Sequence, residues 1–179
     1  MPDLADPLAS LEPCGIDVSL GGLIYTIPPV PASKWLSALF DDFGSFSGVI
    51  ELLTVADRAA IEQQIIDGTI AAEDMEAVFH DAVEVASGRT WWVVINYMNL
   101  ARGFWARFHG RVLASGMNPD KVSFGAYLDA IHFAFIEGRE EQGIQKITNF
   151  LETPPPGVKI DLDEDSEGET FLAMLNGSR

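Results

Sequence analysis

The sequence predicts a mainly α-helical bundle with one β-hairpin near its N-terminus. Apolar residues recur at the i, i+3, i+4 spacing of amphipathic helices through most of the 179 residues, and glycines separate these segments. Residues 16–27 instead alternate apolar and polar side chains on either side of a Gly-Gly pair, which is typical of a hairpin. We expect a flexible arm over residues 1–13, a single domain over residues 14–153, and a Pro-rich, acidic, disordered tail over residues 154–179.

The charge of the chain limits its partners. With 27 acidic and 11 basic residues the net charge is -16. Such a surface repels nucleic acid and anionic membranes, so neither is an expected partner unless the protein mimics DNA. The single cysteine, Cys14, allows no internal disulfide, and the chain does not begin with a signal-peptide pattern. We therefore expect a cytoplasmic protein.

The predicted hairpin has a defined register. A two-residue Gly-Gly loop suits the primed turns of hairpins and pairs Leu20 with Leu23, Val18 with Tyr25, and Ile16 with Ile27. One face of the ribbon is then apolar. Because an isolated hairpin is only marginally stable in water, this face must lie on the helical body.

A helix is expected over residues 33–43, capped by Ser33, with Trp35 on its apolar stripe. Residues 45–53 are apolar but short and contain Gly48, so their structure stays open at this point. The T-V-A-D sequence that follows is a capping box with the shorter acid and opens a helix over about residues 54–67.

The next helix begins at Thr69 or Ala71 and ends at Gly88. Residues 90–116 are then predicted to form one long central helix, capped by Thr90 and ended by Gly116. Apolar side chains occupy most of its circumference, which is typical of a buried helix. Asparagines and arginines interrupt it well short of the ~20 apolar residues of a membrane span.

Two more helices complete the predicted bundle. Asn118-Pro119 indicates a new helix start, with apolar residues at helical spacing over residues 123–137. The last helix covers about residues 139–152, and three consecutive prolines end regular structure.

The tail joins acidic and apolar residues. Beyond Gly157 a dense acidic run precedes four apolar residues: Phe171, Leu172, Met174 and Leu175. Such a group either docks on a partner as a short helix or folds back onto its own domain. Separately from the tail, self-association of the protein stays open.

The sequence offers little catalytic chemistry. It has no phosphate-binding glycine loop and no nucleophile elbow. Asp129 and His132 are three residues apart, a spacing at which two side chains on one helix can share a metal; His109 and Glu84 are conceivable further ligands. The simpler interpretation is a surface carboxylate beside a partly buried histidine. We predict no enzyme, no cofactor and no metal.

The order of features resembles the tail assembly chaperones of long-tailed, siphovirus-type bacteriophages and prophages of actinobacteria. The resemblance covers roughly residues 16–157. The segments that carry it are the hairpin leading into IPPVPASKWLSAL, then SGRTWWVVINYM, FWARFHGRVLASGMNP, SFGAYLDAIHFAF, and FLETPPPG before an acidic end. These motifs are structural, and none has a diagnostic chemistry.

The resemblance implies a virus-encoded protein of the host cytoplasm that is absent from the mature virion. It would bind the tape measure protein, keep this long apolar chain soluble, and support polymerisation of the tail tube protein around it. The family often makes a second, longer product by ribosomal frameshifting, which a protein sequence does not reveal.

A binding surface for such a client would draw on aromatic and apolar side chains. The candidates are Trp35, Trp91, Trp92, Trp105 and the tail residues Phe171, Leu172, Met174 and Leu175. Three alternatives stay open: an acidic DNA mimic or inhibitor, another small helical interaction protein, and a metal-dependent helical-bundle enzyme that uses Asp129 and His132.

Overall fold

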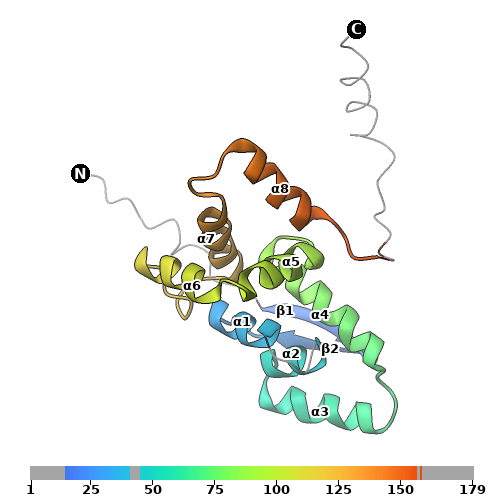
Figure 1. Ribbon diagram of the computed structural model, residues 1–179. Coiled ribbons are helices and arrows are strands. Elements are labelled where there is room, and N and C mark those ends of the chain that lie inside the picture. The colour runs from blue at the N-terminus through green and yellow to red at the C-terminus, as the bar shows by residue number, and fades with distance from the viewer. Residues whose placement is uncertain (1–14, 41–44, 157, 159–179) are drawn as a thin grey trace, which may run out of the picture.

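The computed structural model describes residues 15–40, 45–156 and 158. This part of the chain contains eight helices and one two-stranded antiparallel sheet (Figure 1). The predicted fold class, mainly α with an N-terminal hairpin, is confirmed. None of the helices among these residues has the length and apolar character needed to cross a membrane. The expected arm over residues 1–13 and the acidic part of the tail lie outside the described residues.

The hairpin has the predicted register. Strand β1 (Ile16–Leu20) pairs with β2 (Leu23–Ile27), and Leu20 is opposite Leu23. Gly21 and Gly22 connect the strands with φ of 57° and 76°, the left-handed conformation that a type I′ turn requires at both positions. Four residues of the predicted apolar face are buried, namely Val18, Leu20, Tyr25 and Ile27, whereas Ile16 is partly buried and Leu23 is 52% exposed. Strand β1 packs on helix α4 (Ala72–Ser87).

Helix α1 (Ala32–Phe40) begins one residue before the predicted cap, Ser33. The amides of Ala32 and Ser33 donate to the carbonyls of Val122 and Pro119, at 3.0 and 3.1 Å. The prediction of a local cap was therefore wrong, because a loop distant in sequence satisfies the first amides.

Residues 45–53, whose structure the sequence left open, form helix α2 (Ser45–Leu52). Gly48 allows this helix to lie close to its neighbours. A Cβ at Gly48 would be 2.8 Å from a ring carbon of Phe79 and 3.2 Å from the carbonyl oxygen of Ala38. The glycine that argued against a helix is thus the residue that lets the helix pack.

The caps of the next two helices form largely as predicted. Helix α3 (Val55–Ile66) starts at Thr54, whose hydroxyl accepts from the amide of Asp57 at 3.3 Å. Helix α4 begins after Ala71, whose amide donates to the carboxylate of Asp74 at 2.9 Å. Gly88 ends α4 with φ of 67°.

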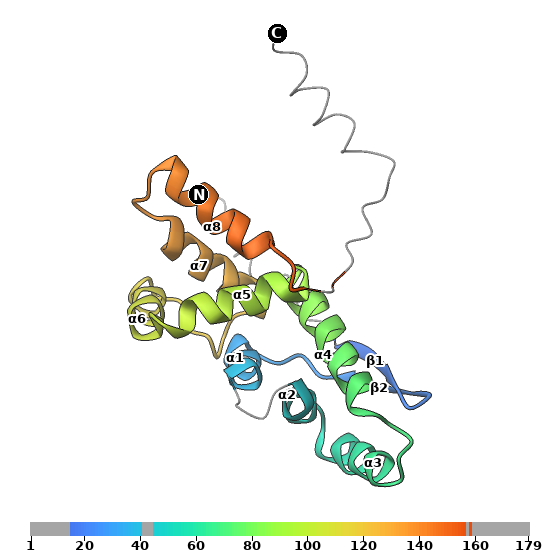
Figure 2. The same ribbon diagram turned by 45° about the vertical axis from the view of Figure 1, so that its right-hand side comes forward.

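The predicted single helix over residues 90–116 was wrong. Two helices occupy this segment, α5 (Trp91–Arg102) and α6 (Trp105–Ala114), and they run in different directions (Figure 2). The break lies at Gly103 and at Phe104, whose φ of -132° is not helical. Glycine is a weak helix former, so a break at this position costs little when packing favours it.

The starts of α5 and of α7 (Phe124–Ile136) also differ from the prediction. Thr90 makes no capping hydrogen bond through its side chain, and the amide of Trp91 donates instead to the Glu84 carboxylate at 2.9 Å. Asn118 does not cap a helix; its side chain accepts from the amide of Asp120 in a turn. Ser123 caps α7.

Helix α8 (Glu141–Glu152) completes the fold and runs beside α7 (Figure 1). Helices α5 to α8 form one end of the molecule, whereas α2 and α3 form the other (Figures 1 and 2). Helix α4 connects them, since it contacts the hairpin and α2 as well as α5 and α7. A single apolar cluster runs through both ends.

The close approach at Gly48 generates a stability prediction. Gly48→Ala is expected to lower the free energy of unfolding by about 1 kcal/mol, because overpacking against the buried Phe79 ring outweighs the gain in helix propensity. Gly110→Ala is the matched control: a Cβ there meets no atom within 4 Å, so the same exchange should stabilise by about 0.5–1 kcal/mol. Urea unfolding of both variants measures the difference. Equal effects of the same sign would contradict the packing role of Gly48.

Candidate binding surface

The four tryptophans do not form one surface. Trp35 is 2% exposed and stacks on Phe124, with ring centroids 5.5 Å apart. It belongs to the core and offers no surface to a partner in this structure.

Trp91 and Trp92 lie at the start of α5 and are partly buried. The ring of Trp91 stacks on His80 of α4, with centroids 3.7 Å apart, and meets Trp92 edge-on at 5.9 Å. Burial of His80 lowers its pKa, against the opposing effect of nearby carboxylates such as Glu76. A neutral imidazole against an indole ring makes this a packing contact of α4 with α5.

Trp105 begins α6 and has other neighbours. Its ring stacks on His109 at 5.0 Å and meets Phe40 edge-on at 4.8 Å. The guanidinium of Arg102 lies 5.7 Å from the centre of the Phe40 ring. Trp105 is partly buried, so only a part of its ring can contact a partner.

The other candidate residues of the sequence, Phe171, Leu172, Met174 and Leu175, lie outside the described residues.

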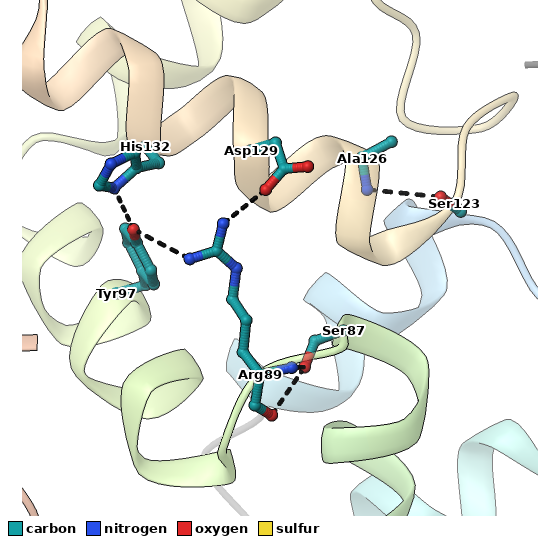
Figure 3. Close-up of polar contacts among 7 residues, drawn as sticks. All are labelled: Ser87, Arg89, Tyr97, Ser123, Ala126, Asp129 and His132. Carbon is teal, nitrogen blue, oxygen red and sulfur yellow. Dashed lines mark hydrogen bonds and ion pairs between the residues drawn. The ribbon is translucent and has the colours of Figure 1, made fainter. Parts of the chain in front are cut away.

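The Asp129–His132 pair takes part in a polar network rather than an open metal site (Figure 3). Arg89, which follows α4, donates to the Asp129 carboxylate at 2.5 Å and to the Tyr97 hydroxyl at 3.4 Å. The Tyr97 hydroxyl also hydrogen-bonds to Nδ1 of His132. A guanidinium cation is therefore bound to the carboxylate that a metal would use.

Because Arg89 can only donate, the Tyr97 hydroxyl accepts from it. The same hydroxyl can donate its own proton to Nδ1 of His132 when the imidazole is neutral and carries its proton on Nε2. Burial lowers the pKa of His132, and the charge of Arg89 lowers it further, against Asp129. Burial also raises the pKa of Tyr97.

A second tyrosine–histidine pair joins α6 to α7. Nδ1 of His109 lies 2.6 Å from the Tyr127 hydroxyl, and burial raises the pKa of Tyr127 to about 12. Glu84 is used to cap α5. Neither His109 nor Glu84 joins the Asp129–His132 pair, and among the described residues no three His, Cys, Asp or Glu side chains converge as metal ligands.

A groove of about 500 Å³ lies where α5, α6, α7 and α8 meet. We call it the four-helix groove, and its lining residues are Leu100, Phe104, Arg107, Phe108, Arg111, Ala134, Phe135, Glu137, Arg139 and Ile147. Apolar side chains form most of this lining. Phe104 is 58% exposed, so much of its ring is open to solvent.

The polar part of the groove is basic. Arg111 pairs with Glu137 at 3.2 Å, as expected of an arginine in so acidic a chain. The guanidinium of Arg139 donates to the carbonyl of Phe135 at 2.6 Å. For Arg107, no carboxylate of a described residue lies within 4 Å.

Sequence reasoning missed the groove because it read residues 90–116 as one straight helix. The turn at Gly103 carries α6 away from the axis of α5, and the exposed Phe104 lies at that turn. The glycine inside the apolar segment was the available signal, since an isolated glycine in a helical pattern weakens the helix.

Comparison of the chain with protein-family models, with curated proteins and with solved structures gave no match.

The network around His132 generates a pH prediction. The pKa of His132 is lower in the folded chain than the 6.5 of a free histidine, so the unfolded chain binds more protons as the pH falls. The stabilising contribution is therefore complete above about pH 6.5 and is lost as the pH drops toward the folded pKa. Urea unfolding between pH 7.5 and 5.5 should show stability falling, and His132→Gln should reduce this fall. An unchanged pH dependence in the variant would exclude His132 as a contributor.

Proposed function

We propose that this protein is a phage tail assembly chaperone that binds the tape measure protein and keeps it soluble while tail tube subunits polymerise. The family resemblance of the sequence suggests this role, and the four-helix groove is the structural observation that supports it best. The proposal places the protein in the host cytoplasm during virus assembly and not in the mature virion.

The groove suits one face of an amphipathic helix. Such helices bind by inserting anchors at i, i+3, i+4 and i+7 into an apolar groove, and a tape measure protein is long, apolar and helix-rich. Burying one Leu or Phe side chain contributes about 1.5–3 kcal/mol, from which the costs of association are subtracted. Two or three anchors give a reversible contact, which a chaperone that must release its client needs.

The charge distribution supports a role in dispersing an aggregation-prone client. Residues 45–88 carry nine acidic residues and one basic residue, Arg58. The part of this segment that forms α2 and α3 is the end of the molecule away from α5 to α8, whose residues line the groove (Figure 1). A complex that presents it to solvent is kept apart from other complexes by repulsion.

The alternatives gain no specific support. A metal-dependent enzyme would need the Asp129 carboxylate that Arg89 already binds. A DNA mimic needs acids at phosphate-like spacing on a rigid surface, whereas nine of the 27 acidic residues fall in the segments whose composition predicts a flexible arm (residues 1–13) and tail (residues 154–179).

The test is co-expression with the tape measure protein encoded beside this chain, followed by size-exclusion chromatography and mass spectrometry of the soluble fraction. We expect a soluble complex that is lost when this protein is omitted. A tape measure protein that aggregates in both cases, with this chain eluting alone, would overturn the proposed function.

A pair of variants tests whether the groove is the client site. Phe104→Ser removes an exposed anchor and places a good capping residue at the start of α6, so the fold should persist. We expect its affinity for the client to fall about tenfold.

The matched control for this variant is Val55→Ser. It changes an apolar side chain that is 81% exposed at the acidic end of the molecule, and it should bind like the unchanged protein. Equal affinities of the two variants would exclude the four-helix groove as the client site.

A further inference from the structure

The four-helix groove combines an apolar lining with positive charge. Three of the chain's seven arginines line it: Arg107, Arg111 and Arg139. Against them stands one carboxylate, that of Glu137, which is paired with Arg111. The groove therefore fits a ligand that presents apolar side chains together with carboxylates.

The positive charge is local to this end of the molecule. Residues 89–152 carry seven basic and six acidic residues, whereas residues 45–88 carry one basic and nine acidic. An acidic ligand is repelled by α2, α3 and α4 and meets no such repulsion at α5 to α8.

One segment of the same chain has the complementary composition. Residues 161–169 contain six carboxylates, and after Thr170 the sequence F-L-A-M-L follows at 171–175. In this segment, carboxylates lie a few residues before the apolar side chains. In the groove, arginines likewise lie beside an apolar lining, so the two arrangements are complementary.

The chain length allows this segment to reach the groove. Ile147 of α8 lines the groove, and α8 ends at Glu152, about 8 Å further along the helix axis. The six residues from Glu152 to Val158 carry the chain at most about 22 Å further. The thirteen residues from Val158 to Phe171 span up to about 45 Å, more than these two distances together.

The position of the end of α8 favours the same geometry. The side-chain amide of Asn96 donates to the carbonyls of Leu151 and Thr153, both at 3.1 Å, and so holds this end of α8 on α5. Leu100, one helical turn after Asn96, lines the groove.

We infer that residues 161–175 of this chain occupy its own four-helix groove. The apolar side chains of residues 171–175 cover Phe104 and Ile147, and the carboxylates of residues 161–169 lie near Arg107 and its neighbours. Because the segment is tethered, its effective concentration is about millimolar, and an affinity in the millimolar range suffices to fill half of the grooves. If the proposed function holds, the segment shields the groove until a client displaces it.

The full-length chain allows a direct test. A nitroxide label at Ala173→Cys, in a chain that also carries Cys14→Ser, is expected to broaden the amide NMR signals of residues 104–111 and 147. The signals of α3, at the other end of the molecule, should stay sharp. Equal broadening of both regions, or of neither, would overturn the inference.

Charge variants separate specific docking from loose proximity. Arg107→Glu in the labelled chain should lower the docking constant about fivefold, since Arg107 is exposed and an exposed ion pair contributes up to about 1 kcal/mol. Lys34→Glu makes the same charge change at an exposed position of α1 away from the groove and should leave the broadening unchanged. Equal broadening in these two variants would show that the arginine has no part in docking.

A mixed sample identifies which copy the segment occupies. Isotope-labelled chain without nitroxide is mixed with unlabelled chain that carries it. Broadening that disappears in the mixture supports docking within one chain, and broadening that persists would overturn it in favour of exchange between two copies. The samples in these measurements contain no client, so their outcome is independent of the outcome of the co-expression experiment.

Discussion

The burial of helix α4 is the constraint on which the rest of the structure depends. The residues that fill its buried positions are Met75, Val78, Phe79, Ala82 and Val83. The hairpin and α2 cover it on the N-terminal side of the fold, and α5 and α7 cover it on the other. A two-stranded ribbon cannot bury its apolar face alone, and α2 is too short to be stable alone, so both depend on this helix. Close approach is secured by glycines: Gly48 brings α2 near Phe79, and Gly125 lies against the Ser87 carbonyl.

The turn at Gly103 is the second constraint, because it divides the segment into two helices and leaves a groove where α5 to α8 meet. A straight helix over residues 90–116 would place its apolar surface around one axis and bury it in the bundle. With the turn, α5 lies between α4 and α8 while α6 lies against α7, and the space where the four helices meet is incompletely filled. Protein interiors are normally close-packed, so the incompletely filled, largely apolar groove of about 500 Å³ beside the exposed Phe104 is the feature on which the proposed binding role rests.

Local interactions explain which parts of the fold the sequence could predict. The hairpin register follows from a two-glycine loop, and the start of α3 follows from a cap three residues away in sequence. The start of α1 could not be predicted, because its amides bind carbonyls of Pro119 and Val122. The groove was missed for the same reason: its lining comes from residues between Leu100 and Ile147 on four helices, and no pattern within one helix encodes that meeting.

The two ends of the molecule differ in charge, and this difference affects whether the groove favours basic or acidic ligands. A chain of net charge -16 would be expected to favour basic ligands everywhere on its surface. Its three groove arginines reverse that preference at one place, since local charges within a Debye length of about 8–10 Å outweigh more distant ones. Under the proposed function, a basic client is attracted to the molecule as a whole but not to the groove, whereas an apolar helix that carries carboxylates is favoured there. If the inferred docking of residues 161–175 also holds, a client segment must compete with them for the groove.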